Sequence, residues 1–287
     1  MNILKGAVVS AAVKEELLQK KEELKNDIPT LAIIRVGEKA DDISYEKGAT
    51  KKMESLGIRV ESHVFPEDIS DEAFKEAFCR INEDENVDGL LVLRPLPPQI
   101  CEKDLEKMID PEKDVDGIGM ENMSKVYAGD LSGYAPCTAQ AVMEMIRYLQ
   151  IPLEGKRVAI LGRSLVLGKP LTMLLMKENA TVTVCHTRTQ NVQQICREAE
   201  IVIAAMGSPK AIKKEYLGEN AIVIDVGVNV DEEGKLCGDV DFDDVKDVAH
   251  IITPVPGGVG AVTTTVLAKH VIESALKKKD RIYEKTV

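Results

Sequence analysis

The sequence predicts an α/β protein of two domains: an N-terminal α/β domain, followed by a Rossmann-like domain with a parallel sheet. Three observations predict this class. Short runs of β-branched and other apolar residues alternate with stretches of helical periodicity. The alternation is interrupted near Pro136–Thr138 and then resumes. With 287 residues, the chain is long enough for two domains of ordinary size.

We therefore expect one domain over residues 1–137 and a second over residues 138–261. Residues 262–287 have helical periodicity up to a charged tail, and this last helix is expected to pack back on the first domain.

In the first half, three short apolar runs predict strands and two longer periodic stretches predict helices. The strands are expected at Thr30–Val36, Ile58–Phe65 and Gly89–Leu93. The helices are expected at Asp42–Leu56, which Gly57 would end, and at Asp71–Asn82. The third strand runs into Arg94-Pro95-Leu96-Pro97-Pro98, which cannot continue a ladder because proline lacks the backbone donor. From Asp110 to Pro136 we expect a turn-rich region.

The second half repeats the alternation. It opens with a helix expected at Thr138–Leu149. Five strands are expected at Arg157–Leu161, Ala180–Cys185, Ile201–Ala205, Ala221–Val226 and His250–Thr253. Two further helices are expected at Lys169–Glu178, with Pro170 in its first turn, and at Val262–Lys279.

Composition excludes several classes of function. A net charge of −11 argues against a nucleic-acid partner, which needs a concentrated basic face. No apolar run reaches the roughly 18–20 residues of a membrane helix, and the N-terminus lacks the pattern of a signal peptide. The six cysteines and four histidines are scattered, so no metal site and no disulfide framework is expected. We expect a cytoplasmic protein.

A dinucleotide site is indicated where the strand at Arg157–Leu161 meets Gly162-Arg163-Ser164 and, further on, Gly168-Lys169-Pro170. A glycine turn lets the backbone approach a pyrophosphate, and the following helix N-terminus presents free N–H groups. The spacing is not G-x-G-x-x-G, so a tight βα turn of an ordinary α/β domain is the alternative.

The end of the next strand bears on the choice of cofactor. An NAD site usually has an acidic residue there, whereas this strand ends in Cys185-His186-Thr187-Arg188. Thr187 can donate a hydrogen bond, and Arg163 and Arg188 can face a 2′-phosphate. This pattern favours NADP over NAD, unless these arginines are solvated surface cations.

Glycine loops after later strands could complete a ligand crevice. They comprise Met206-Gly207-Ser208, Val226-Gly227-Val228 and Pro254-Val255-Pro256-Gly257-Gly258-Val259-Gly260. In open α/β sheets, ligands bind at the carboxyl ends of the strands. The last loop could form a backbone wall against a flat ligand or serve as a rigid hinge between domains.

Together with further segments, these motifs resemble the FolD family of methylenetetrahydrofolate dehydrogenase/cyclohydrolases over almost the whole chain. Each motif is short, but their order and spacing are specific. In chain order they are Val36-Gly37 with Ser44-Tyr45, Gly89-Leu90-Leu91-Val92 before Pro95-Leu96-Pro97, Lys113-Asp114-Val115-Asp116-Gly117, Pro136-Cys137-Thr138, Gly162-Arg163-Ser164 with Gly168 and Pro170, and Thr253 to Gly260.

The resemblance implies an N-terminal catalytic, folate-binding domain, an NADP-binding second domain, a cleft between them, and usually a homodimer. It implies oxidation of 5,10-methylenetetrahydrofolate, commonly followed by hydrolysis to 10-formyltetrahydrofolate. Tyr45 would stack on the aminobenzoate ring of the substrate, and Asp116 would bind its pterin; a core tyrosine and a turn aspartate are the alternatives. Further substrate contacts are expected at Pro95, Leu96, Pro97, Gly257 and Gly258. Cofactor contacts are expected at Gly162, Arg163, Ser164, Gly168, His186, Thr187, Arg188, Gly207, Val228 and Thr263.

Two departures from the family pattern concern hydrolysis. The family motif has a lysine four residues after the tyrosine, where this chain has Ala49, and a glutamine two residues before Pro95, where this chain has Leu93. This pair serves the hydrolytic step in the family. The sequence therefore predicts a dehydrogenase with weak or absent cyclohydrolase activity.

Three alternatives stay open at this point: a bifunctional enzyme whose acid/base has moved, for which Lys52 is a candidate, a folate- or nucleotide-binding protein without catalysis, and an unrelated dehydrogenase acting on a hydroxy acid.

Overall fold

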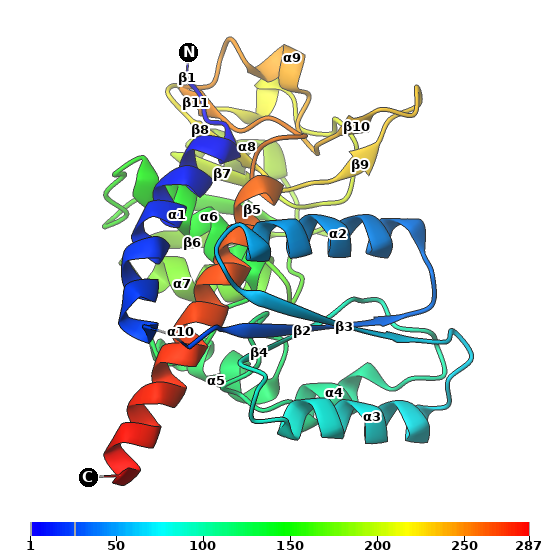
Figure 1. Cartoon of the computed structure of the whole chain (residues 1–287). Helices are drawn as coiled ribbons and strands as arrows, with labels where there is room; N and C mark the ends of the chain where they lie inside the picture. The colour runs from blue at the N-terminus through cyan, green and yellow to red at the C-terminus, as the bar shows by residue number, and fades with distance from the viewer. Residues whose placement is uncertain (1, 26, 287) are drawn as a thin grey trace. The chain divides into compact units, whose positions relative to one another are not determined.

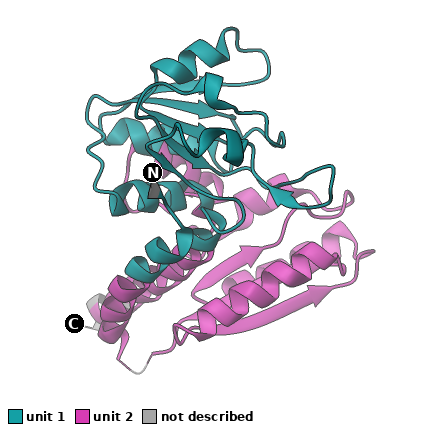
Figure 2. Cartoon of the chain, turned by 90° about the horizontal axis from the view of Figure 1, so that it is seen from above, with its two compact units in different colours: residues 1–13, 138–263 teal, residues 14–137, 264–287 magenta. Residues whose placement is uncertain are grey.

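A computed structural model describes residues 2–25 and 27–286 (Figure 1). The chain divides into two compact units, shown in different colours in Figure 2. Unit 1 comprises residues 1–13 and 138–263, and unit 2 comprises residues 14–137 and 264–287. Two helices, α1 (Gly6–Lys21) and α10 (Gly260–Thr286), contribute residues to both units.

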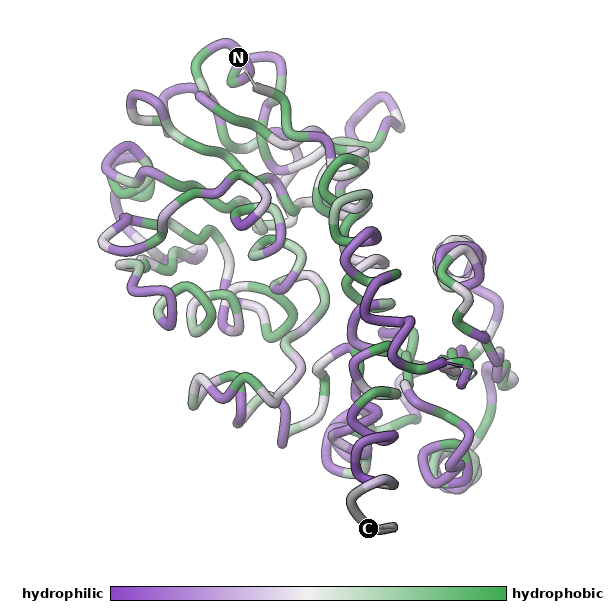
Figure 3. Tube along the Cα trace, turned by 60° about the vertical axis from the view of Figure 1, so that its left-hand side comes forward, coloured by the Kyte–Doolittle hydropathy of each residue, from purple (hydrophilic) through white to green (hydrophobic). Residues whose placement is uncertain are grey.

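Unit 1 is built on a six-stranded parallel sheet in the order β1-β11-β8-β7-β5-β6. The strands are β1 (Asn2–Ile3), β5 (Arg157–Leu161), β6 (Thr181–Cys185), β7 (Ile201–Ala204), β8 (Ile222–Asp225) and β11 (Ile251–Ile252). Hydrophobic residues run along these strands, and hydrophilic residues gather on the loops (Figure 3). β6 and β7 lie on opposite sides of β5, so the strand order reverses there. Such a reversal marks the crevice where open α/β sheets bind ligands.

Helices and a short hairpin complete unit 1. The helices are α6 (Cys137–Tyr148), α7 (Gly168–Lys177), α8 (Val192–Glu198), α9 (Phe242–Val245) and the 3₁₀ turn η2 (Lys214–Tyr216). The hairpin pairs β9 (Asn229–Val230) with β10 (Leu236–Cys237) in antiparallel fashion. One face of the sheet is closed by Cys196 of α8 and Val245 of α9, which belong to the same buried cluster as Ala159 and Val202.

Unit 2 has a three-stranded parallel sheet in the order β3-β2-β4, formed by β2 (Thr30–Val36), β3 (Arg59–Phe65) and β4 (Gly89–Val92). Helix α2 (Ala40–Glu54) lies on one face of the sheet, and α3 (Asp71–Glu83) and α4 (Glu102–Met108) lie on the other (Figure 1). Helix α5 (Met120–Ala128) and the 3₁₀ turn η1 (Glu22–Leu24) complete the unit. Phe74 and Phe78 of α3 pack on alternate residues of the strands, such as Ile34.

The predicted α/β class with parallel sheets is what the structure has, but some elements differ from the expectation. The turn-rich prediction for residues 110–136 was wrong for Met120–Ala128, which forms α5. Glycines at 117, 119, 129 and 133 bracket this short helix and obscured its periodicity. Helices α1, α4 and α8 were not predicted.

The N-terminal residues also differ from the expected domain limits. β1 pairs with β11, and the Gly6 N–H donates to the Gly257 carbonyl at 2.8 Å, which brings residues 1–13 into unit 1. Among the described residues, no helix is long and apolar enough to span a membrane.

Candidate functional site

Gly162 occupies the crevice where the strand order of unit 1 reverses. It follows β5, and its φ of +133° lies in a region that L side chains rarely adopt. A Cβ at this position would overlap the carbonyl oxygen of Ala205, at the end of β7. A glycine is therefore required here, and its backbone is open to close approach by a ligand.

Helix α7 begins immediately after this turn. Gly168, its first residue, has no room for a Cβ against the Gly162 carbonyl. The exposed Ser164 accepts a hydrogen bond from the Leu167 N–H at 3.1 Å through its hydroxyl, which holds the loop before the helix. The positive end of a ten-residue helix thus meets a close-packed glycine turn, an arrangement that suits a pyrophosphate.

Two arginines lie near the places where an additional phosphate is expected. Arg163 and Arg188 are exposed, and neither forms an ion pair with a residue that the structure describes. Thr187 is exposed beside Arg188, while the His186 ring accepts the Arg188 N–H at 3.1 Å through Nδ1. The loop after β6 thus offers the cation Arg188 and the hydroxyl of Thr187 and carries no acid, while Arg163 lies in the loop after β5. This set of groups fits a 2′-phosphate better than a free ribose hydroxyl.

The loops after β7 and β8 present mostly apolar side chains. Met206 is 45% exposed and Val228 is 71% exposed. At Gly207, which has φ of +66°, a Cβ would meet nothing within 4 Å. The side chains and open backbone at this edge suit contact with a ring.

The loop that precedes α10 combines close packing with an open glycine. A Cβ at Gly258 would overlap the Pro254 carbonyl, whereas Gly257, with φ of +95°, has free space around it. Thr263 donates its hydroxyl to the Val259 carbonyl at 3.2 Å, so in this structure its hydroxyl stabilises the first turn of α10.

A second group of candidate side chains lies in unit 2, where Asp116 lies close to Tyr45 of α2. Burial raises the pKa of the Tyr45 hydroxyl above its usual range, and the nearby charges of Asp116 and Cys137 add to this effect. Although 39% of Tyr45 is exposed, burial is the largest cause, which indicates that its hydroxyl end is the covered part. Residues 71 positions apart in sequence thus form one site.

The thiol and the backbone N–H of Cys137 lie beside the Asp116 carboxyl group and lower its pKa, while the thiol donates to the Val115 carbonyl at 3.3 Å. Burial raises the pKa of Asp116, while these donors and the positive charge of Arg94 act in the opposite direction. Burial and the neighbouring Asp116 raise the pKa of the Cys137 thiol, which therefore stays protonated and can donate. Sequence reasoning did not identify Arg94 or Cys137 as neighbours of Asp116.

Asp114, two residues earlier, has a structural role. Its carboxyl group accepts hydrogen bonds from the N–H groups of Ile118 and Gly119 at 2.9 and 2.8 Å, and from Asn122 Nδ2 at 2.9 Å. Burial raises its pKa to about 6. It thereby shapes the turn that carries Asp116, and Gly117 in that turn has φ of +64° and no room for a Cβ against the Tyr134 carbonyl.

The positions that distinguish this chain from the family pattern are closed to solvent. Ala49 lies one helical turn after Tyr45 and is 0% exposed, and Leu93, just after β4, is 7% exposed. An alanine methyl and a leucine side chain supply neither a proton donor nor an acceptor. Both buried positions are therefore apolar.

Helix α2 is held by a partly buried ion pair. Arg35 Nε of β2 donates to Glu46 Oε2 at 2.7 Å, and the other oxygen of Glu46 accepts the Ser62 hydroxyl from β3. Because Glu46 directly follows Tyr45, these contacts determine where the tyrosine lies above the sheet.

The proline-rich loop after β4 is held by side chains on both sides. The Leu96 N–H donates to Glu102 Oε1 at 2.7 Å, and Lys39 Nζ donates to the Pro95 carbonyl at 3.1 Å. Pro95 is exposed, whereas Leu96 and Pro97 are buried, so of the three predicted contacts only Pro95 presents a largely open surface.

Lys52 lies seven residues after Tyr45 and is partly buried. Burial lowers its pKa, and the nearby Lys14 of α1 lowers it further. Its lowered pKa resembles that of an acid/base group, and the charge that lowers it beyond the effect of burial is that of Lys14 on α1.

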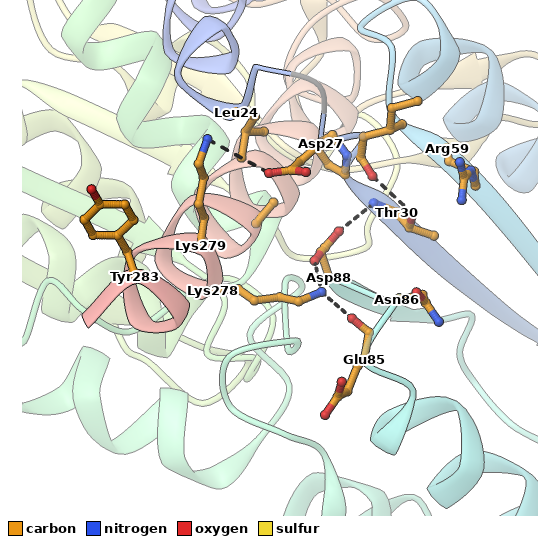
Figure 4. A pocket seen from close by; sticks show the side chains of 13 residues that line it. Leu24, Asp27, Thr30, Arg59, Glu85, Asn86, Asp88, Lys278, Lys279 and Tyr283 are labelled. Atoms are coloured by element: carbon orange, nitrogen blue, oxygen red, sulfur yellow. Dashed lines mark hydrogen bonds and ion pairs between the residues drawn. The ribbon is translucent and has the colours of Figure 1, made fainter. Parts of the chain in front are cut away.

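A cavity of about 800 Å³ lies elsewhere in unit 2, at the amino ends of the three strands (Figure 4). Lys278 pairs with Asp88 at 2.9 Å, and Lys279 lies 3.9 Å from Asp27. The charge of Arg94 acts on Asp116, and Arg94 follows the carboxyl end of β4. The cavity, at the amino ends of the strands, is therefore at the opposite end of the sheet from Asp116. Because its lysines pair with acids, we assign it no role in the site.

The fold and these two groups of residues define a two-domain α/β protein with a Rossmann-like nucleotide-binding domain. The catalytic domain of tetrahydrofolate dehydrogenase/cyclohydrolase matches residues 4–116, and the NAD(P)-binding domain of the same family matches residues 136–279. The chain belongs to the tetrahydrofolate dehydrogenase/cyclohydrolase family, as the sequence motifs predicted.

Relatives and solved structures agree with this assignment. The bifunctional protein FolD of Clostridium kluyveri is 48% identical over 282 residues, which cover 98% of this chain and 99% of the relative. The crystal structure of a bifunctional FolD dehydrogenase/cyclohydrolase from Campylobacter jejuni superimposes with a TM-score of 0.93 at 36% identity, covering 96% of this chain and 99% of the other.

A second solved structure is the Trypanosoma brucei dehydrogenase-cyclohydrolase, complexed with NADP and an inhibitor. It has a TM-score of 0.89 at 35% identity and covers 96% of this chain and 97% of its own. The predicted fold class is confirmed by these matches.

Proposed function

We propose that this protein oxidises 5,10-methylenetetrahydrofolate to 5,10-methenyltetrahydrofolate with NADP, and that its cyclohydrolase activity is weak or absent. The observation that carries the proposal is the site around Tyr45: Asp116 is retained beside it, whereas the buried positions 49 and 93 are apolar. The binding elements of the family are thus kept without the groups for hydrolysis.

The oxidation needs little acid/base chemistry from the protein. The methylene carbon lies between two nitrogens, whose lone pairs stabilise the cation formed when hydride leaves. Bound NADP supplies the hydride acceptor, and the contribution of the protein is alignment and electrostatics. A raised pKa keeps Tyr45 neutral at physiological pH, which suits a ring that stacks on the aminobenzoate better than an anionic base.

Asp116 suits recognition of the pterin. A carboxylate can accept two hydrogen bonds from the amide and amino groups of a pterin edge, and charged acceptors form stronger bonds than neutral ones. Arg94 and the donors from Cys137 favour the ionised form against the effect of burial.

Hydrolysis of the methenyl cation makes a different demand. Water must be activated and a proton delivered to a nitrogen, which is work for a positioned acid/base group worth roughly 100- to 10,000-fold in rate. Neither Ala49 nor Leu93 can supply such a group. We therefore propose that the reaction stops largely at the methenyl product.

The loop geometry of unit 1 supports NADP as the cofactor. Gly162, Gly168 and the start of α7 would hold the pyrophosphate, and the unpaired Arg163 and Arg188 would face the 2′-phosphate. NAD would leave both cations without a partner.

Two assays on the purified protein test the proposal. The first follows formation of the methenyl product with NADP and with NAD; reduction of neither cofactor would rule out the dehydrogenase and leave a binding protein. The second follows decay of the methenyl product against a buffer control. We expect decay close to that of buffer, and rapid enzymatic decay would contradict the loss of hydrolysis.

A fully bifunctional enzyme with a relocated acid/base is the second candidate. The lowered pKa of Lys52, and its position two turns from Tyr45, favour it. Rapid hydrolysis by the wild type that disappears in Lys52→Met would show that the enzyme is bifunctional and that Lys52 is its acid/base group.

The expected homodimer, the cleft between the domains and the cytoplasmic location stay predictions. Size-exclusion chromatography with light scattering would test the first.

A further inference from the structure

Asp239 is a fully buried aspartate of unit 1, and none of the motifs identified in the sequence contains it. It is 0% exposed and follows β10. Its Oδ2 accepts hydrogen bonds from the N–H groups of Met206 and Gly207, and its Oδ1 accepts from the Ser208 N–H at 2.7 Å. Three consecutive N–H groups of the loop after β7 therefore converge on one side chain.

The same carboxylate also reaches β9, which follows the loop after β8. Asn229 Nδ2 donates to Asp239 Oδ1 at 2.9 Å. β7 and β8 are neighbours in the sheet, and their loops carry Gly207 and Val228, two of the expected cofactor contacts. Asp239 thus links the loop after β7 to the segment that follows β8.

A second buried carboxylate, Asp225, holds Asp239 in place. Asp225 Oδ1 accepts the N–H of Asp239 at 3.1 Å and that of Gly227 at 3.0 Å, and Oδ2 accepts the Val240 N–H at 2.9 Å. The Asp225 N–H in turn donates to the Thr253 hydroxyl at 2.8 Å. Thr253 directly follows β11, so the network spans the ends of three neighbouring strands.

Two glycines are required by these carboxylates. A Cβ at Gly227 would overlap the Asp239 carboxyl carbon, and a Cβ at Gly238 would overlap Asp225 Oδ2. Neither glycine has a positive φ, so backbone freedom does not explain them. Both positions are glycine because a side chain there would occupy the space of the two carboxylates.

These hydrogen bonds determine which groups of the loop after β7 are available to a ligand. Because the N–H groups of 206–208 point to Asp239, they are not free to bind phosphate. What faces outward instead is Met206, 45% exposed, and Val228, 71% exposed. Phosphate recognition is left to Gly162 and α7, and the rim formed by these two loops suits an aromatic ring.

We propose that Asp239 is a positioning residue for the cofactor: it holds the loops after β7 and β8 in register and so determines NADP affinity without touching NADP. This inference rests on the proposed function, since it assumes that the crevice binds NADP. A side chain that accepts four hydrogen bonds cannot be replaced by Asn without turning an NH₂ group towards N–H donors.

The test is Asp239→Asn, with Asp241→Asn as the matched control. Asp241 lies two residues away, and its side chain accepts the Asp244 N–H at 3.4 Å at the start of α9, away from the loops after β7 and β8. NADP affinity is measured by isothermal titration calorimetry, and KM for NADP and for the folate by initial rates. Circular dichroism and thermal melting report whether each variant is folded.

We expect Asp239→Asn to weaken NADP binding by about 10- to 100-fold, as for loss of a charged hydrogen-bond acceptor. KM for the folate should change less than about threefold, and Asp241→Asn should resemble the wild type. If Asp239→Asn does not fold, Asn229→Ala removes a single bond of the network and should weaken NADP binding by about three- to tenfold.

Two results would overturn the inference: a folded Asp239→Asn protein with wild-type NADP affinity, or equal losses for NADP and folate, which indicate a general structural role. Failure of the proposed function is seen separately, as a wild-type protein that does not bind NADP.

Discussion

The double variant Ala49→Lys with Leu93→Gln is expected to gain cyclohydrolase activity. Position 49 lies one turn from Tyr45 and is fully buried, so a lysine there would direct its amine towards the site that Tyr45 shares with Asp116. A positioned acid/base group is worth about 100- to 10,000-fold, which is roughly 3–5 kcal/mol of activation free energy. The methenyl product should therefore decay faster by a factor in this range.

The gain has a cost in stability that the structure also predicts. A lysine at a closed alanine position adds three methylene groups and an amine to a packed site, and such overpacking costs about 1–3 kcal/mol. For a chain of this size, about 2–4 °C of melting temperature is lost per kcal/mol. The assay is therefore run at 20–25 °C (roughly ambient, below the expected melting range), following loss of methenyl absorbance with and without enzyme.

The matched control is Ala49→Met with Leu93→Gln, which adds a chain of similar length without the amine. It should show the same loss of stability and no gain in hydrolysis. Equal hydrolysis by the two variants, or no gain in a folded lysine variant that still reduces NADP, would refute the reasoning.

Three further predictions concern single carboxylates and one cation. Asp116→Asn should raise KM for the folate by about 10- to 100-fold, because a charged acceptor is lost, with KM for NADP nearly unchanged in initial-rate assays. Arg188→Ala should reduce the preference for NADP over NAD by about tenfold, measured as the ratio of kcat/KM values. Asp114 has a folded pKa of about 6, raised from 3.8 by burial, so it favours the folded state at low pH and this contribution is lost as the pH rises from about 4 to 6. The free energy of unfolding of the wild type relative to Asp114→Asn should fall by about 3 kcal/mol between these limits in urea titrations, and an unchanged difference would contradict the raised pKa.

Strands such as β2 and β5 were predictable because central parallel strands are buried on both faces and read as continuous apolar runs. Thr30–Val36 and Arg157–Leu161 have the same bounds in sequence and structure. Helix α5 was not predictable by the same means, because nine residues between glycines give too short a periodic signal. Its start depends on Asp114, which accepts the Gly119 N–H from outside the helix.

The site was predictable only in part. The glycine turn at Gly162 has a local signature, since a strand, a glycine and a helix start follow one another. The proximity of Tyr45 and Asp116 has none, and the sequence indicated it only through the family resemblance. The role of Asp239 could not be predicted, because an aspartate after a glycine reads as a loop residue and nothing local shows that its carboxylate turns inward.

The apolar character of positions 49 and 93 also bears on the first reaction itself. Loss of hydride from the methylene carbon creates a positive charge on the substrate. A protonated amine at position 49 would oppose that charge; at about 5 Å and an effective dielectric constant of about 20, the repulsion is roughly 3 kcal/mol. Ala49 removes this repulsion, and the charge of an ionised Asp116, the form that Cys137 and Arg94 favour against the effect of burial, would attract the cation. On the proposed function, a lysine at position 49 would serve hydrolysis and oppose the charge that oxidation creates, whereas alanine at this position would favour the oxidation.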